Sequence, residues 1–152
     1  GTKLGYSVRF NESVVRNMGR SATGVRGVNL RPGDQVVGAS VITDQDEVLI
    51  ITEKGYGKRT RADEYPTKGR GGKGVKVAKV TKKTGKIVAV KSVLGNEDLM
   101  IMTDQGIIIR IDVSTISTLG RTATGVKVIN LVDDQKVATV TLAAKEESYE
   151  EE

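Results

Sequence analysis

The chain contains no cysteine and no histidine among its 152 residues. These two absences exclude disulfide bonds, zinc, haem and iron–sulfur sites, cysteine nucleophiles and every catalytic triad that depends on histidine. A magnesium or calcium site built only from carboxylates remains compatible with this composition. The lack of cysteine is consistent with a reducing compartment, where disulfide bonds are rare.

Aromatic residues and proline are also scarce, at 3% aromatics and only 2 Pro beside 18 Gly. The core must therefore be built from Val, Ile, Leu and Met. No apolar run is long enough to span a membrane, and Gly1–Phe10 has no apolar segment of a signal peptide. The chain opens without Met and in the middle of a repeated pattern, so we expect its start to be cut rather than native.

The formal net charge of +5 hides an asymmetry between the body of the chain and its end. Glu146–Glu152 holds five glutamates, so the preceding residues are more basic than the net value indicates. A basic body with an acidic tail suggests a polyanionic partner and a tail that competes with that partner. A soluble protein with a plainly disordered terminus would show the same composition, and both interpretations stay open.

An internal repeat of roughly 50 residues organises the chain. Its landmarks are Thr-x-x-Gly at 2–5, 52–55 and 103–106, Gly-Arg at 19–20, 69–70 and 120–121, and Gly-Val-Arg/Lys at 24–26, 74–76 and 125–127. They predict a first unit over residues 1–45 that lacks its opening strand, a second over 46–95, a third over 96–143, and an acidic disordered tail over 144–152.

Each unit is predicted to hold four short strands and little helix, which makes the chain all-β. The expected hairpins pair 47–52 with 55–60 and 98–103 with 106–111, and the expected later strands cover 25–30, 36–41, 75–81, 86–93, 126–132 and 136–142. Helical turns are expected within 11–18, 62–66 and 113–119. Four strands per unit is typical of a β-propeller blade. Because a closed propeller needs at least four blades, about three four-stranded blades indicate part of a larger ring, either cut short or completed by a partner.

Three positions of the repeat are basic in every copy. They are Arg9/Arg59/Arg110, Arg20/Arg70/Arg121 and Arg26/Lys76/Lys127. A periodic row of cations along the rim of a ring would match successive phosphates of a bent DNA duplex held without base contacts. Two other interpretations remain, namely solvated strand faces and arginines that cap carbonyl groups at the turns between blades.

The middle unit has the densest positive charge, around the sequence GRGGKGVK at 69–76. Glycines let the backbone approach a phosphate closely and expose its N–H groups. The match to G-x-G-x-x-G is not a dinucleotide site, since a strand rather than a helix follows it. The predicted DNA-binding residues are Arg9, Arg20, Arg26, Lys58, Arg59, Arg61, Lys68, Arg70, Lys73, Lys76, Arg110, Arg121 and Lys127, with backbone phosphate contacts at Gly69, Gly71, Gly72 and Gly74.

The repeat and above all GRGGKGVK resemble the C-terminal domain of DNA gyrase A, with the corresponding C-terminal domain of topoisomerase IV as the near alternative. The resemblance implies a six-bladed β-pinwheel whose blades exchange strands and whose basic rim wraps duplex DNA. The family's gyrase box, Q-[RK]-R-G-G-[RK]-G, is only partly kept, because Lys68-Gly69 stands where Gln-Arg is expected. This departure and the position of the motif suggest the last three blades of the ring.

The resemblance also implies the cellular setting. The wrapping domain is non-catalytic, and the ATP-dependent holoenzyme, a bacterial type II DNA topoisomerase, uses it to introduce negative supercoils. The expected partners are duplex DNA, the rest of gyrase A, and gyrase B, with self-association as another way to complete the ring. We expect no membrane, no metal and no cofactor in this chain, ATP and Mg²⁺ being used elsewhere in the holoenzyme, and a cytoplasmic, nucleoid-associated location.

Two functions of other classes stay open beside DNA wrapping. A protein-interaction propeller would use the faces of the ring rather than its rim, although the WD signature is absent because the chain has no Trp. An enzyme would need a catalytic constellation, and no carboxylate pair stands out, since Glu97-Asp98 and Asp133-Asp134 lie at predicted turns.

Overall fold

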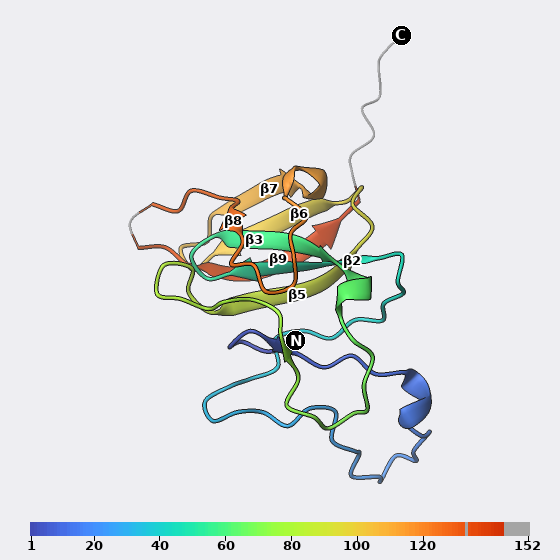
Figure 1. Ribbon diagram of the computed structural model, residues 1–152. Coiled ribbons are helices and arrows are strands. Elements are labelled where there is room, and N and C mark those ends of the chain that lie inside the picture. Colours follow the sequence, from blue (N-terminus) through green and yellow to red (C-terminus); the bar gives the residue numbers. More distant parts are fainter. Residues whose placement is uncertain (133, 145–152) are drawn as a thin grey trace.

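The computed structural model describes residues 1–132 and 134–144, which form an all-β fold with short 3-10 turns. Figure 1 shows the sheets as stacked layers, with β6, β7 and β9 on one side of β2, β3 and β5 and the first unit on the other side. The elements are β1 (Tyr6–Ser7), η1 (Glu12–Val14), β2 (Glu47–Thr52), β3 (Tyr56–Arg61), η2 (Ala62–Glu64), β4 (Val75–Lys76), β5 (Ile87–Val93), β6 (Asp98–Thr103), β7 (Ile108–Asp112), η3 (Val113–Thr115), β8 (Val126–Lys127) and β9 (Val137–Ala143).

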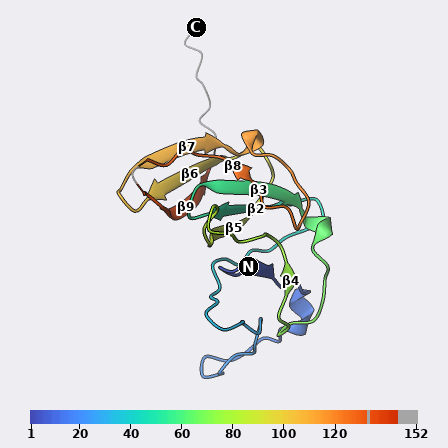
Figure 2. The same ribbon diagram turned by 60° about the vertical axis from the view of Figure 1, so that its left-hand side comes forward.

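Consecutive units exchange a strand. The second sheet has the order β5-β2-β3-β8, so its first three strands come from the second unit and β8 comes from the third. In the same way, β4 of the second unit pairs with β1 of the first, and Figure 2 shows β4 near β1 and β8 beside β3. The strand exchange that the resemblance implies is therefore confirmed.

The number of strands per sheet differs from the expected four in two units. The third sheet, β7-β6-β9, has three strands because the described residues hold no further unit to place a strand beside β7. In the first unit, the strands expected at 25–30 and 36–41 do not form regular strands, and only an isolated bridge joins Thr2 to Val36. These segments lack a full neighbouring strand, and Val36 and Val41 are exposed.

The recurring Thr-x-x-Gly sequence forms the hairpin turn of each unit. In the second unit, the N–H of Gly55 donates to the carbonyl oxygen of Thr52 at 3.2 Å, and the N–H of Tyr56 donates to Thr52 Oγ1 at 3.2 Å. The threonine hydroxyl thus satisfies a backbone donor that a tight turn leaves free. The equivalent Thr2 and Thr103 make the same contacts and are likewise buried.

The core is aliphatic, as the composition predicts, and lies between the layers. Leu49 and Ile51 of β2 face the third sheet, whereas Val48 and Ile50 face the first unit. This alternation follows from the two-residue period of a strand and explains why the four central residues of β2 are all apolar. Tyr65 is buried in the second cluster and packs against aliphatic residues there. No helix of the described residues is long and apolar enough to cross a membrane.

Candidate nucleic-acid interface

The exchanged strands carry the third basic position of the repeat. Lys76 lies in β4 opposite Tyr6, and Lys127 lies in β8 opposite Tyr56. Both lysines are exposed and lie on the strands at the edge of their sheets. Their ammonium groups have no polar partner among the residues that the structure describes. The same cation is therefore presented at the same place of two successive layers.

The glycine that precedes each exchanged strand is required for the crossing between units. Gly74 and Gly125 have φ values of +83° and +98°. A Cβ atom at Gly74 would lie 2.7 Å from the carbonyl oxygen of Ser7, and one at Gly125 would lie 2.9 Å from that of Gly57. The positive φ and the close carbonyl oxygen each mean that any residue with a side chain would strain the backbone at these positions. The repeated Gly-Val-Lys sequence is thus the device that places the lysines on the neighbouring unit.

The Gly-Arg corners connect each unit to the preceding one. Arg70 Nη1 donates to the carbonyl oxygen of Arg26 at 3.3 Å, and Arg121 Nη1 donates to that of Lys76 at 2.6 Å. The carbonyl-capping interpretation therefore fits these two arginines. Each donates to the backbone carbonyl oxygen of the residue at the third basic position in the unit before it. Arg20 is exposed and has no such contact within the described part of the chain. A guanidinium has five donors, so one capped carbonyl still leaves N–H groups for a phosphate.

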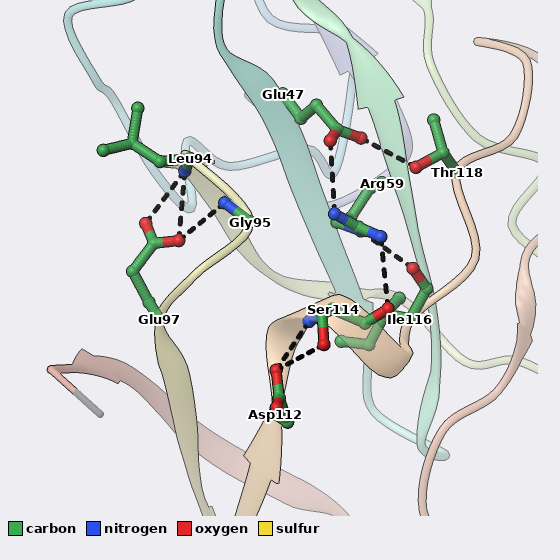
Figure 3. A network of polar contacts seen from close by, with 9 residues as sticks. All are labelled: Glu47, Arg59, Leu94, Gly95, Glu97, Asp112, Ser114, Ile116 and Thr118. Atoms are coloured by element: carbon green, nitrogen blue, oxygen red, sulfur yellow. Dashed lines mark hydrogen bonds and ion pairs between the residues drawn. The ribbon is translucent and has the colours of Figure 1, made fainter. Parts of the chain in front are cut away.

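Arg9 and Arg59 also bridge consecutive units, but each contacts the unit that follows its own rather than the one before it. Arg59 Nε donates to the carbonyl oxygen of Ile116 at 2.8 Å and pairs with Glu47 at 3.2 Å, and its side chain is only 13% exposed. Figure 3 shows the guanidinium between Glu47 and the turn that carries Ser114 and Ile116. Arg9 donates in the same way to Ala62 and pairs with Asp44.

Arg110 occupies the same position in the third unit but contacts its own unit. It pairs with Asp98 at 2.7 Å and donates to the carbonyl oxygen of Ala144. The first basic position of the repeat is therefore used mainly to hold one unit against the next. Contact of these arginines with DNA stays a prediction, and the geometry supports the capping role.

Lys58 was expected at the rim, but its side chain is buried and the residue is only 1% exposed. Its Nζ donates to the carbonyl oxygens of Gly120 and Arg121 at 2.9 and 2.6 Å. Burial lowers the pKa of Lys58 to about 8, while the nearby Glu64 carboxylate opposes the shift and the Arg121 guanidinium adds to it. In this structure the ammonium group is inaccessible to a phosphate. Arg61 is exposed and forms an ion pair with Asp63.

The GRGGKG loop presents cations but uses part of its backbone internally. The side chains of Lys68 and Lys73 are exposed without a polar partner in the described ranges. The N–H of Gly71 donates to the carbonyl oxygen of Gly27 at 2.7 Å, so this amide is not free for a phosphate. Gly69 and Gly72 are exposed. The loop borders a cavity of about 210 Å³ that Ser7–Arg9 also line.

The structure thus separates the predicted cations into two groups. The exposed ones without a partner in residues 1–132 and 134–144 are Arg20, Arg26, Lys68, Lys73, Lys76 and Lys127. The ones held in contacts between or within units are Arg9, Lys58, Arg59, Arg61, Arg70, Arg110 and Arg121.

One cation was missed by the sequence analysis. Arg31 donates to the carbonyl oxygen of Lys73 at 2.7 Å, and its guanidinium lies over the ring of Tyr6. The repeat did not indicate Arg31, because the corresponding turn is not basic in all three copies. No group of acidic residues in the described part of the chain is arranged to hold a metal ion.

Known proteins show two kinds of similarity to this chain. The family described as "DNA gyrase C-terminal domain, beta-propeller" matches residues 1–43, 46–93 and 97–144. DNA gyrase A of Staphylococcus aureus strain MRSA252 is 51% identical over 153 residues, which cover 99% of this chain and 17% of that relative. The chain therefore spans a small part of the length of the curated relatives it matches.

Solved structures agree with this similarity. A structure of the DNA gyrase A C-terminal domain has a TM-score of 0.85 at 28% identity, over 93% of this chain and 48% of that chain. A C-terminal domain of DNA topoisomerase IV has a TM-score of 0.85 at 25% identity, over 93% of this chain and 44% of that chain.

Proposed function

The chain belongs to the family of DNA gyrase C-terminal domains, and on this basis we propose that it binds and bends duplex DNA through the edge strands of its successive layers. The observation that carries the proposal is the repeated placement of Lys76 and Lys127. Each stands at the same position of an exchanged strand, exposed and without an acidic neighbour in an ion pair.

The chemistry of these edges suits a phosphate backbone rather than base edges. Lysine ammonium groups and exposed glycine amides contact phosphate oxygens without reading sequence. The cation recurs at the same place in two successive stacked layers, and a duplex that followed such cations around further layers of a ring would have to curve. Binding of this kind is indifferent to sequence and weakens steeply with salt, because neutralised phosphates release counterions.

In the whole protein, this domain would serve gyrase A together with its partner gyrase B. Wrapping DNA would allow the ATP-dependent enzyme to introduce negative supercoils, with ATP and Mg²⁺ acting elsewhere and no catalytic group in this chain. We place the enzyme on the nucleoid in the cytoplasm. Gyrase is favoured over topoisomerase IV because the sequence relatives at 50–51% identity are gyrase A proteins.

The open edge of the third sheet indicates where the ring would continue. Within residues 1–132 and 134–144, β7 has no exchanged strand beside it, whereas β1 and β3 each have one. The missing strand would come from other blades of the same protein or from a second copy of this chain. Sedimentation of the isolated chain separates the two sources, since a second copy doubles the mass of the particle.

A salt titration of DNA binding tests the proposal. The logarithm of the binding constant of the chain for a linear duplex should fall linearly with the logarithm of the salt concentration, with a slope of about −0.9 for each phosphate neutralised. Lys76→Gln and Lys127→Gln should each reduce the slope by about 0.9. Lys91→Gln, which removes the same charge from β5 at the opposite edge of the second sheet, serves as the control. A slope near zero, or a strong preference for one sequence, would contradict DNA wrapping.

A further inference from the structure

Two hairpin-turn tyrosines each have a cation from a later turn at the ring and a lysine opposite them on an exchanged strand. In the first unit, Tyr6 lies opposite Lys76 of the second unit, and the Arg31 guanidinium carbon is 3.5 Å from the centroid of the Tyr6 ring. In the second unit, Tyr56 lies opposite Lys127 of the third unit, and Lys83 Nζ is 5.7 Å from the centroid of the Tyr56 ring. The arrangement is therefore repeated from one layer to the next.

We infer that each tyrosine and its two cations form a phosphate clamp, so that Arg31 and Lys83 are DNA-contacting residues in a second row beside Lys76 and Lys127. The inference rests on the proposed function and extends it to residues outside the three basic positions of the repeat. The first clamp is Tyr6, Arg31 and Lys76. The second clamp is Tyr56, Lys83 and Lys127.

The pairing of the strands brings the members of a clamp onto one face. Directly opposite residues on antiparallel strands point to the same side, with Cβ atoms about 4.5–5.5 Å apart. Lys127 therefore stands beside the Tyr56 ring, which attracts Lys83 through its negative face. The ring holds the second cation near the first although like charges repel. An anion between them would relieve this repulsion, and a phosphate group supplies one.

The second clamp has no acidic partner that would explain it as a structural ion pair. Lys83 and Lys127 are both exposed, and neither forms an ion pair within the part of the chain that the structure describes. In the first clamp, Arg31 also donates to the carbonyl oxygen of Lys73. This bond fixes the guanidinium beside the GRGGKG loop and leaves other N–H groups of Arg31 for a ligand.

The third unit lacks every element of the clamp. Ile107 stands in place of the tyrosine, the sequence of the later turn is Asp133-Asp134, and β7 has no exchanged strand in the described residues. An aliphatic residue at this position of the repeat by itself indicates a packing role for Tyr6 and Tyr56. Both tyrosines are partly exposed, however, and each has a cation at its ring. The second row should therefore end before the third unit.

The test measures the affinity of the whole chain for a linear duplex of unselected sequence, with thermal melting of every variant. Lys83→Gln should weaken binding about eightfold at 0.1 M monovalent salt and reduce the salt slope by about 0.9, the loss of one phosphate contact. Tyr56→Leu removes the ring but keeps the apolar bulk, and it should weaken binding about two- to fivefold. Tyr56→Phe keeps the ring and should retain the affinity. Lys91→Gln is the charge-matched control.

The outcomes separate this inference from the proposed function. If the unmodified chain shows no salt-dependent binding, DNA wrapping itself is wrong. If it binds and Lys127→Gln weakens binding, but Lys83→Gln and Tyr56→Leu behave like Lys91→Gln, the clamp alone is overturned. Lys83 makes no hydrogen bond through its ammonium group in the described residues, so the folding of Lys83→Gln should be intact. Arg31→Gln, judged against its melting temperature, repeats the test on the first clamp.

Discussion

Lys58 provides a sharp test of the packing between the second and third units, because its burial predicts how stability changes with pH. The pKa of Lys58 is lowered to about 8 in the folded chain, from an ordinary value of 10.5. Between these values the unfolded chain binds more protons than the folded chain, so the free energy of unfolding must rise with pH. Below about pH 8 the buried charge is present in full and its destabilising effect is constant.

The expected gain follows from the two pKa values. Between pH 8 and pH 9.5 the folded chain should gain about 1.5 kcal/mol of stability from the deprotonation of Lys58. For a chain of this length, this gain raises the melting temperature by roughly 3–6 °C. Two other groups contribute little in this window, and they do so equally in the wild-type chain and in a Lys58 variant. The Gly1 amine has a pKa lowered from 8.0 by burial, and burial raises the pKa of the Tyr65 hydroxyl above its ordinary value of 10.0.

The assay is urea unfolding of the wild-type chain and of Lys58→Met at several pH values between 8 and 9.5. Met keeps an unbranched apolar side chain in a position that holds Val8 and Ile109 in the other units, but it leaves the carbonyl groups of Gly120 and Arg121 without their donor. Its stability should change much less with pH in this window than that of the wild-type chain, which should rise by about 1.5 kcal/mol more. Equal slopes for both proteins would refute the assignment of the buried charge to Lys58.

Three further comparisons test the packing of the chain, each by the free energy of unfolding in urea. Arg59→Gln should lower the free energy of unfolding by about 2–3 kcal/mol, because buried carbonyl groups lose a charged donor. Arg110→Gln should lower it by less than about 1 kcal/mol, because the Arg110 side chain is 35% exposed. Equal losses would contradict the bridging role of Arg59. Gly125→Ala should lower the free energy of unfolding by at least about 2 kcal/mol more than Gly106→Ala. Gly106 also has a positive φ, but a Cβ atom there would meet no atom within 4 Å. Similar losses for the two variants would refute the steric argument. Tyr65→Phe should leave stability unchanged or raise it by up to about 1 kcal/mol, since the buried hydroxyl has no hydrogen-bond partner among the described residues. A clear loss of stability would contradict this reasoning.

The first strand of each complete hairpin was predictable to the residue. The expected 47–52 and 98–103 are the bounds of β2 and β6, because each is an apolar run of strand length that ends at the Thr-x-x-Gly turn. The 3-10 turns η1, η2 and η3 also fall inside the expected turn segments. The apolar and turn-forming residues that define these elements lie within the elements themselves, so the local sequence pattern was enough to predict them.

The strand exchange could not be derived from local pattern. β4 and β8 are two residues long, and their partner strands belong to the preceding unit. Pairing of so short a segment is decided by the path of the chain through Gly74 or Gly125, which depends on a neighbouring carbonyl rather than on periodicity. Only the resemblance to a known family indicated it.

The sequence indicated which positions of the repeat are basic, but not which of these cations are exposed and which hold one unit against the next. A cation repeated in every unit can face either DNA or the next unit, and the repeat alone does not distinguish Lys127 from Arg59. The distinction depends on long-range contacts, such as the bond from Arg59 to Ile116. For Lys58 a signal was available, because a lysine at a position that is Val8 and Ile109 in the other units indicates a buried amine.

The central claim is that the exposed cations of successive layers curve a duplex around the chain. The most direct measurement is the linking number of relaxed circular DNA that is nicked, bound by the chain and resealed. We predict that the topoisomer distribution shifts in proportion to the amount of bound protein, and that Lys76→Glu together with Lys127→Glu abolishes the shift. Saturated binding without any change of the topoisomer distribution would contradict the account.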